Sequence, residues 1–407
     1  MKRYLYILIT SFLILALAGC QQPDVGDQTD VTAREWSWVL DSADGTSATL
    51  YHNLESEDKL EWLEKTVKTR LESSGITLRL EKKPIMELID KLEQEKINEI
   101  ESGTIDLILV DGSDMAMLYE KDLVYGPFLN KVPNYHTNVN PEDYEFMYAE
   151  GQELNYSALP VFRNQLAMVY DEDVLDEPPA TLEEMIDLIM ASPGSFTFPM
   201  PDDQSGRQFM ETFFATFSDY ETLYRVNPTR EEVEAAVVPA LEKLRVLKNA
   251  LYKKGEIYPA DEEQQDMLFF EGQIGFALTT NPVKASKRSR IETYPFGARA
   301  FIPAGGTVGD TMYMVIPFNS ANKSAGMIFA NETLTADVQL AKYKPSEGSD
   351  LPVVDTSRMD SAEAKKLTTV TIKRADIKQA DLLAGRIPDM PERTSMILAE
   401  IWREILE

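Results

Sequence analysis

The sequence contains 407 residues, of which 43% are hydrophobic, and it carries 68 acidic residues against 40 basic ones for a net charge of -28. A chain of this length and apolar content can bury enough surface for two ordinary domains. Recognition of nucleic acids rests on a positive field, so this composition excludes a nucleic-acid-binding protein. The acidic surface fits a cationic ligand, although solubility or a saline or alkaline habitat explains it as well.

The first residues have the pattern of a lipoprotein signal peptide. A basic start is followed by an apolar run from Tyr4 to Ala16 and by Leu17-Ala18-Gly19-Cys20. An uncleaved membrane anchor is the alternative, but the apolar run is shorter than the roughly 20 residues that span a bilayer. We therefore predict a signal peptide over residues 1–19 and a protein that is lipid-anchored to the cell membrane on its extracytoplasmic side.

Cys20 is the only cysteine in the sequence. If its thiol carries the lipid, no thiol remains for a disulfide, a thiolate metal site or a cysteine nucleophile. The two histidines, His52 and His136, lack the spacing of a metal-binding pair. We therefore expect no cofactor and no protein-bound metal. Residues 20–34 are polar and lack apolar periodicity, which predicts a flexible tether between the lipid and the folded chain.

Strand and helix patterns alternate in the first part of the folded chain. Residues 48–52 predict a strand, and apolar residues then recur at helical spacing from position 60 to position 71. Residues 76–80 predict a strand, residues 85–100 a helix and residues 105–110 a buried strand. This β-α-β-α-β order predicts a parallel sheet that is covered by helices.

A second unit follows the same pattern. Residues 166–170 and 196–198 predict strands. Capping boxes are expected at Thr181 with Glu184, at Ser205 with Gln208 and at Thr229 with Glu232. The remaining predicted elements are a helix end, glycine turn and strand over 268–276, a strand over 312–316, a helix over 323–334 and a closing helix over 396–406. We assign residues 35–165 and 300–335 to a first α/β domain, and residues 166–299 and 336–407 to a second one.

Several segments resemble those of the type 2 solute-binding lipoproteins of ABC importers. These segments are Gly103-Thr104-Ile105-Asp106-Leu107-Ile108 with Asp111-Gly112, Phe270-Glu271-Gly272-Gln273-Ile274-Gly275-Phe276, Thr311 to Pro317, and Ala321 to Thr335 with Asn331. The run from Leu123 to Phe128 and on to Tyr135 is similar to an uncharacterised subgroup of that family. The sequence departs from the subgroup at His52-Asn53-Leu54-Glu55, where a small glycine-rich loop is usual.

The resemblance implies a two-domain α/β fold of the periplasmic-binding-protein type 2 class, with a hinge and an interdomain cleft. It implies a monomer that captures a small solute in this cleft and delivers it to ABC permease and ATPase subunits. Because the departure at His52 alters the pocket, the identity of the ligand does not follow from the resemblance.

Candidate ligand-binding residues follow from the rule that ligands bind beyond the carboxyl ends of strands in open α/β sheets. In the first domain they are His52, Asn53, Asp111, Gly112 and Ser113. In the second domain they are Ser205, Gly206 and Arg207, where helix amides and a guanidinium can hold an oxyanion. Asn164, Asp310 and Thr311 flank the crossovers between the domains, and Gly305, Gly306 and Gly309 are assigned to the hinge.

Each candidate also has a simpler structural explanation. Asp111 and Asp114 are residues favoured as helix caps, and Arg207 fits a solvated arginine behind a capping box. Arg163 either faces the cleft or forms a surface salt bridge. The tyrosines at positions 51, 119, 125 and 313 favour a cation or an organic amine, the two arginines favour an anion, and a zwitterion satisfies both.

Two other functions remain open at this point. One is an extracytoplasmic hydrolase with a pair of catalytic carboxylates, whose separation a sequence does not reveal. The other is an adhesin or assembly lipoprotein that uses the same fold without transport. The sequence lacks a Gly-x-Ser-x-Gly elbow and any clear catalytic constellation, so a binding protein rather than an enzyme is the prediction.

Overall fold

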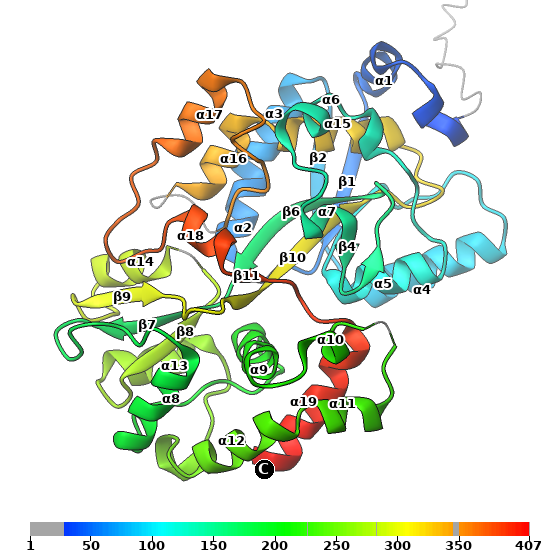
Figure 1. Ribbon diagram of the computed structural model, residues 1–407. Helices are drawn as coiled ribbons and strands as arrows, with labels where there is room; N and C mark the ends of the chain where they lie inside the picture. The colour runs from blue at the N-terminus through cyan, green and yellow to red at the C-terminus, as the bar shows by residue number, and fades with distance from the viewer. Residues whose placement is uncertain (1–27, 226, 282, 345–349, 407) are drawn as a thin grey trace, which may run out of the picture.

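The computed structural model describes residues 28–225, 227–281, 283–344 and 350–406. It has two lobes, one above the other in Figure 1, and each is built on its own sheet. The signal peptide and Cys20 lie outside the described residues, as does most of the expected tether. Within the described ranges, no helix is long and apolar enough to cross a membrane.

The strands form two main sheets and one small hairpin. A 6-stranded sheet has the order β11-β10-β3-β1-β2 with β6 paired to β10, a 3-stranded sheet has the order β8-β7-β9, and β4 pairs with β5. The strands are β1 (Ser47–His52), β2 (Thr77–Lys82), β3 (Leu107–Val110), β4 (Tyr148–Ala149), β5 (Gln152–Glu153), β6 (Ala158–Gln165), β7 (Ala167–Asp171), β8 (Phe276–Thr279), β9 (Ala298–Phe301), β10 (Thr307–Val315) and β11 (Arg386–Ile387).

Helices cover both sheets. Those of the first half are α1 (Trp36–Ala43), α2 (Glu57–Trp62), α3 (Lys68–Ser73), α4 (Ile85–Ile97), α5 (Gly112–Glu120), α6 (Pro133–Asn138), α7 (Tyr144–Met147), α8 (Leu182–Ala191) and α9 (Gln204–Phe217). Those of the second half are α10 (Tyr220–Leu223), α11 (Arg230–Ala236), α12 (Val238–Lys248), α13 (Glu262–Phe270), α14 (Lys284–Arg290), α15 (Lys323–Thr333), α16 (Ala336–Tyr343), α17 (Ser361–Thr368), α18 (Gln379–Ala384) and α19 (Glu392–Leu406). Short 3-10 helices occur at η1 (Gln28–Ala33), η3 (Leu129–Lys131) and η4 (Tyr252–Gly255), and η2 (Leu63–Val67) is a π-helical turn.

The first lobe confirms the predicted parallel sheet. Strand β1 pairs in parallel with β2 and with β3, and Leu50 lies opposite Leu107. The strand residues Leu107 to Val110 are all buried, as expected for a parallel strand covered on both faces. Strand β10 runs antiparallel to β3 and carries the chain back from the second lobe.

The second lobe has an aromatic core under its 3-stranded sheet. Phe198, Phe209 and Phe213 lie around Trp402 of α19, with ring centroids 5.3, 6.2 and 5.5 Å from the Trp402 ring. Trp402 is fully buried at the centre of this core. Residues 196–198 form no strand, so the strand predicted there was wrong, and Phe196 and Phe198 are instead buried loop residues of this cluster.

Two neighbouring connections, together with the segment between β11 and α19, join the lobes. Strand β6 continues into β7 after Leu166, and β9 leads through Gly305 and Gly306 into β10. Both glycines have positive φ, which confirms that this connection needs their conformational freedom. The Leu166 amide donates to the Val308 carbonyl over 3.0 Å, so the two connections lie side by side and form the hinge.

The packing of two segments differs from the assignment made from the sequence. Val338, Val353 and Leu367 belong to the hydrophobic core of the first lobe, although residues 336–407 were placed with the second. Within that segment, α19 packs on α9 of the second lobe and Ala375 belongs to a second-lobe core cluster. At the other end, Val31 is already buried in the first-lobe core, so ordered structure begins before the expected tether ends.

Candidate functional site

The loop after β3 lies at the edge of the first lobe that faces α19. Asp111 caps α5, and its Oδ1 accepts from the Asp114 amide at 3.0 Å and from the Ser113 hydroxyl at 2.9 Å. A Cβ on Gly112 would lie 2.8 Å from the Glu150 side chain, so the loop and the β4–β5 turn are in close contact. The helix-cap role of Asp111 is therefore present, whether or not it also contacts a ligand.

Helix α9 provides the opposite side of the site. Its N-cap is Asp203, whose Oδ1 accepts from the Ser205 amide at 2.9 Å, so the expected capping box at Ser205 was wrong. Ser205 and Gly206 are buried, and a Cβ on Gly206 would lie 2.2 Å from the Pro199 carbonyl oxygen. The amides of Ser205 and Gly206 thus serve the cap, while the Arg207 side chain is left to reach toward β10.

Arg207 and Asp310 form the centre of the site. The Arg207 Nη2 donates to the Asp310 Oδ2 at 3.2 Å, and the Gln204 amide donates to the same oxygen at 2.5 Å. The Asp310 side chain is only 6% exposed, against 31% for Arg207. The pair therefore ties α9 to the strand that enters the first lobe.

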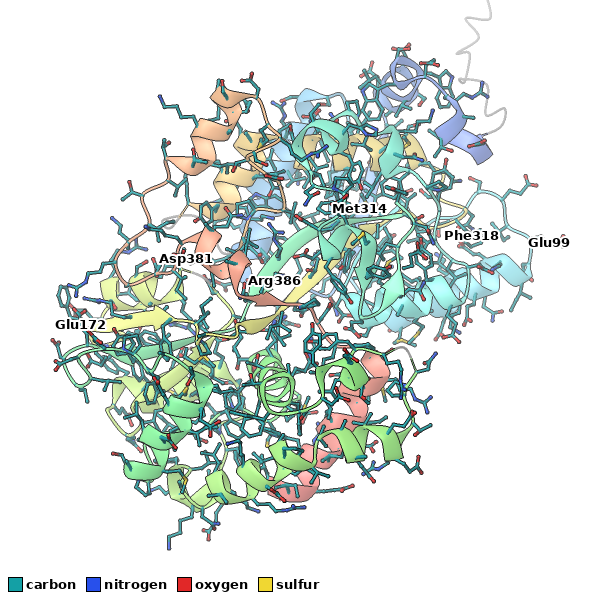
Figure 2. The ribbon with its side chains drawn as sticks, in the orientation of Figure 1. Glu99, Glu172, Met314, Phe318, Asp381 and Arg386 are labelled. Carbon is teal, nitrogen blue, oxygen red and sulfur yellow. The ribbon has the colours of Figure 1, made fainter. Side chains whose placement is uncertain are left out.

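The other junction residues also lie here. Gln208 on α9 donates to the Asn164 Oδ1 at 2.7 Å. The Thr311 hydroxyl accepts from Arg386 at 3.1 Å. Arg386 had no motif in the sequence, yet it lies between the lobes (Figure 2) and forms an ion pair with Glu145 at 2.8 Å. Burial opposes ionisation of Glu145, but Arg386 and Arg163 hold the pKa of its carboxyl below the usual value.

Further carboxyl groups gather around this centre, and we call them the acidic cluster. The acidic cluster consists of Asp111, Asp114, Glu150, Glu211, Asp389 and Glu392. Burial and the Asp111 charge raise the pKa of Asp114 to about 7. Burial raises the pKa of Glu211 to about 7 against the opposing Arg207 charge.

Glu150 and Asp389 are the most perturbed members of the acidic cluster. Burial, followed by the Asp389 charge, raises the pKa of Glu150 well above its usual value. Burial, followed by the Asp310 charge, does the same to Asp389. Neither residue was a candidate from the sequence, since an isolated Glu in a turn and an Asp in a polar tail carry no local signal.

Tyrosines from both lobes lie beside the acidic cluster. Tyr220 stacks on Tyr224 with ring centroids 4.2 Å apart, and the Tyr224 hydroxyl donates to the Pro388 carbonyl at 2.7 Å. Burial raises the pKa of Tyr144 on α7, and the charge of Asp389 and the nearby Tyr220 contribute. These rings differ from the tyrosines expected from the sequence, since Tyr51, Tyr125 and Tyr313 are buried within the first lobe and Tyr119 bonds the Leu154 carbonyl there.

His52 and Asn53 lie apart from these contacts. The buried His52 ring accepts from the Leu54 amide at 3.2 Å through Nδ1, and burial lowers its pKa. Lys82 and Glu64 are its charged neighbours, and the Asn53 side chain is exposed. The structure therefore brings together Asp111, Asn164, Arg207, Asp310 and Thr311, and leaves the end of β1 outside that group.

Arg163 is buried rather than part of a surface salt bridge, and it forms part of the wall of a small cavity beside Glu145. Its side chain is 3% exposed, and it lies 3.5 Å from the Glu145 carboxylate and bonds the Pro352 carbonyl. Its backbone amide donates to Asp350 at 2.7 Å. Arg163 thus fastens the 350–352 segment to β6, a structural role that the sequence did not suggest.

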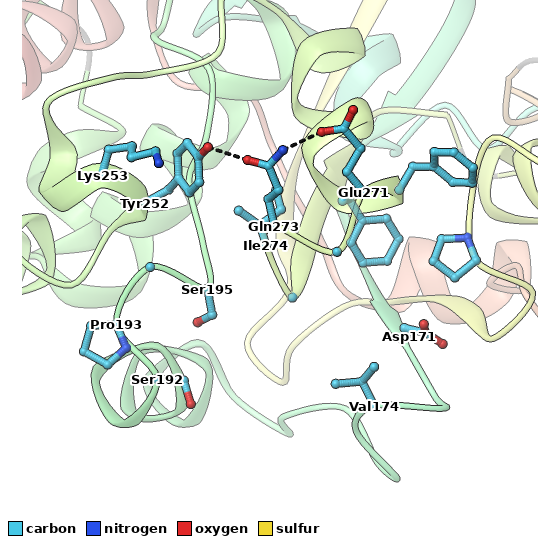
Figure 3. Close-up of a pocket in the computed structure, with 16 residues that line it drawn as sticks. Asp171, Val174, Ser192, Pro193, Ser195, Tyr252, Lys253, Glu271, Gln273 and Ile274 are labelled. Atoms are coloured by element: carbon cyan, nitrogen blue, oxygen red, sulfur yellow. Dashed lines mark hydrogen bonds between the residues drawn. The ribbon is translucent and has the colours of Figure 1, made fainter.

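Two cavities differ in their relation to the lobes. A cavity of about 200 Å³ lies between the first lobe and the crossing segment, with Tyr144, Glu145, Arg386 and Asp389 among its walls. A larger pocket of about 760 Å³ is lined only by second-lobe residues (Figure 3), including Tyr252, which donates to Gln273 at 2.5 Å. Closure of the lobes would not bury a ligand in the larger pocket, so we take the first cavity and the acidic cluster as the candidate site.

Comparisons with known proteins identify the family. Residues 65–371 match the family described as bacterial extracellular solute-binding protein. Protein YnjB of Escherichia coli K12 is 24% identical over 350 residues, which cover 82% of this chain and 86% of YnjB. Both this family and the structures similar to the chain are binding proteins rather than enzymes.

Solved structures share the fold. The structure of an ABC transporter protein from Clostridium perfringens has a TM-score of 0.61 at 15% identity, covering 88% of this chain and 100% of that one. The maltotriose-binding protein of Thermus thermophilus has a TM-score of 0.59 at 18% identity, covering 88% and 99%. Both support the two-domain periplasmic-binding-protein fold with a hinge and a cleft. Since the family match spans most of the described residues, the chain belongs to the bacterial extracellular solute-binding proteins and is extracytoplasmic.

Proposed function

We propose that this protein is the substrate-binding lipoprotein of an ABC importer. It captures a small solute between its lobes and delivers it to the permease and ATPase subunits in the membrane. The observation that carries this proposal is the convergence of side chains from both lobes and from the hinge at Arg207 and Asp310. A solute bound at this position contacts residues of both lobes, and these residues move relative to one another when the hinge closes.

The ligand-binding residues of this proposal are those that the structure brings together. Asp111, Gly112 and Ser113 line the first-lobe side, and Asn164, Asp310 and Thr311 line the hinge. Arg207 orders the second-lobe side through its pair with Asp310. A ligand that contacts both sides stabilises the closed form by its difference in affinity for the two forms.

Native mass spectrometry of protein purified without refolding tests the solute-binding function. A small molecule that co-purifies with the native protein and is lost on unfolding is the expected result. An Asp310→Asn variant should retain less of it, whereas Asp202→Asn, which changes an exposed aspartate before α9, should retain as much as the unaltered protein. Equal retention by both variants would move the site away from the hinge.

The lipid anchor rests on Cys20 and the residues that precede it. Labelling of growing cells with radioactive palmitate should mark the unaltered protein and leave Cys20→Ser unlabelled. The variant should also move from the membrane fraction to the soluble fraction. Equal labelling of both proteins would contradict lipid attachment at this thiol.

A further inference from the structure

The acidic cluster contains more negative charge than the nearby arginines neutralise. Arg207 forms its ion pair with Asp310, and Arg386 forms its own with Glu145. Neither arginine forms an ion pair with a member of the acidic cluster in the described part of the chain. The charges of Arg207 and Arg386 still act on Glu211 and Asp389, but the acidic groups of the cluster outnumber these two cations.

Asp389 gives independent evidence that a ligand group is needed here. The residue is 9% exposed, and its Oδ2 has no hydrogen-bond partner among the described residues. Asp389 also forms part of the wall of the 200 Å³ cavity, beside Tyr144. A buried carboxylate oxygen without a donor is unfavourable, so a donor in the cavity would stabilise it.

Glu150 is a neighbour of Asp389 in the acidic cluster and lies outside the wall of the 200 Å³ cavity. The charge of Asp389 acts strongly on Glu150, and the charge of Asp111 acts on it as well. Glu150 is half-buried, and its carboxylate lies against Gly112 at the start of α5. Two carboxyl groups from different segments, Glu150 after β4 and Asp389 after β11, can therefore receive donors from a single small molecule.

The rings beside these carboxyl groups indicate an organic molecule. Tyr144 belongs to the first lobe, and Tyr220 and Tyr224 belong to the second. Tyr144 is close enough to Asp389, Tyr220 and Glu150 for each to influence its ionisation. Aromatic faces next to carboxylates suit an alkylammonium group, because the rings attract the cation and contact its carbon atoms.

We infer that the cleft takes a small organic cation whose ammonium N–H groups donate to Asp389 and Glu150 and whose carbon atoms contact Tyr144 and Tyr220. The inference rests on the proposed solute-binding function and narrows it to one class of substrate. Arg207 then serves the site by neutralising Asp310 rather than by holding an anion. The 200 Å³ of the cavity matches a molecule smaller than most drug-sized ligands.

Calorimetric titration with probes of different charge tests the inference. The cationic probes are 1,4-diaminobutane and choline, and the others are succinate, maltose and calcium chloride. We expect a cationic probe to bind, and Asp389→Asn and Glu150→Gln each to weaken that binding about 10- to 100-fold, the scale of a lost charge-assisted hydrogen bond. The matched control Asp202→Asn, which removes one exposed carboxylate outside the acidic cluster, should leave the affinity unchanged.

Each other outcome contradicts the inference in a distinct way. Binding of succinate or maltose without binding of either cation would overturn the inference and keep the solute-binding function. Binding of calcium ion with the same dependence on Asp389 would replace the organic cation by a metal ion. Binding of no probe would overturn the inference, and a co-purified solute in the mass spectrum would still support the proposed function. Melting curves of both variants without a probe establish that they are folded.

Discussion

The Arg207 guanidinium on α9 donates to the Asp310 carboxylate on β10, with 3.2 Å between Nη2 and Oδ2. The pair joins a helix of the second lobe to the strand that carries the chain back into the first. Asp310 is almost fully buried, and Arg207 is the cation that forms an ion pair with it in the described part of the chain. Substitutions at this junction between the lobes are therefore expected to change both the stability of the protein and its affinity for a ligand.

Removal of Arg207 should lower stability even without a ligand. We expect Arg207→Ala to reduce the free energy of unfolding by about 1–3 kcal/mol, because Asp310 is left buried and charged without its partner. Urea unfolding at pH 7 measures the change. The double variant Arg207→Ala with Asp310→Asn should recover most of the lost stability. If the double variant instead loses the sum of what Arg207→Ala and Asp310→Asn lose separately, the pair contributes nothing to stability.

A larger loss is expected at Arg163. This arginine is 3% exposed, and Arg163→Leu leaves the buried Pro352 carbonyl without its donor, while Glu145 keeps its ion pair with Arg386. We expect a loss of about 3 kcal/mol, at the lower end of the cost of breaking a buried pair on one side. Arg403→Leu, on the exposed pair with Asp202, is the control and should change stability by less than about 1 kcal/mol. Similar urea midpoints for the two variants would contradict the buried role of Arg163.

The sequence predicted most of the first lobe because its signals are local. The parallel β-α-β-α-β unit of β1 to β3 and the capping box at Thr229 and Glu232 follow from periodicity and caps, and both are present in the structure. The packing of residues 336–368 on the first lobe was not predictable in this way. Those residues carry weak periodicity, and only their contacts with the first-lobe core determine where they lie.

The candidate site was predictable only in part for the same reason. Asp111 and Arg207 lie at the start of helices next to predicted strands, so a rule about strand ends identifies them. Glu150 and Asp389 act through neighbours that are distant in sequence, and nothing in their local sequence indicates a shared cavity. To predict their proximity from the sequence, one would have to know which segment of the chain crosses between the lobes.

Contact between the lobes is also made by one exposed ion pair. Lys287 on α14 lies 2.5 Å from Asp58 on α2, and both side chains are partly exposed. We expect Lys287→Ala to shift the unliganded protein toward a more open form by about 0.5 kcal/mol, the usual strength of such a pair. Raising the salt concentration should shift the unaltered protein toward the open form as well, because salt screens exposed charges.

Distances between spin labels on the two lobes measure this shift. With Cys20→Ser as background, Gln94→Cys on α4 and Val246→Cys on α12 place one label on each lobe at exposed positions. The distance distribution should broaden toward longer distances in Lys287→Ala and contract on addition of a bound solute. A distribution that is unchanged by both would indicate a rigid protein without hinge closure.

The ionisation of Glu211 makes stability depend on pH. Glu211 is 4% exposed and accepts a hydrogen bond from Ser395, and it faces Arg207, Asp310, Tyr224 and Asp389. Its pKa is raised from 4.5 to about 7 in the folded protein, so between these values the unfolded chain loses a proton that the folded chain keeps. The stability that Glu211 contributes is thus fully present below pH 4.5 and is lost as pH rises through about 7, by about 3–4 kcal/mol in total.

Glu211→Gln removes this ionisation while keeping an acceptor for Ser395. We therefore expect the free energy of unfolding to fall less steeply between pH 5 and pH 8 in Glu211→Gln than in the unaltered protein, so that the variant becomes the more stable of the two at pH 8. Urea unfolding at several pH values measures both slopes. Glu263→Gln on α13 is the control, because that residue is exposed and should leave the slope unchanged. Parallel stability curves for Glu211→Gln and the unaltered protein would mean that Glu211 is ionised throughout this range, and that the Arg207 charge outweighs its burial.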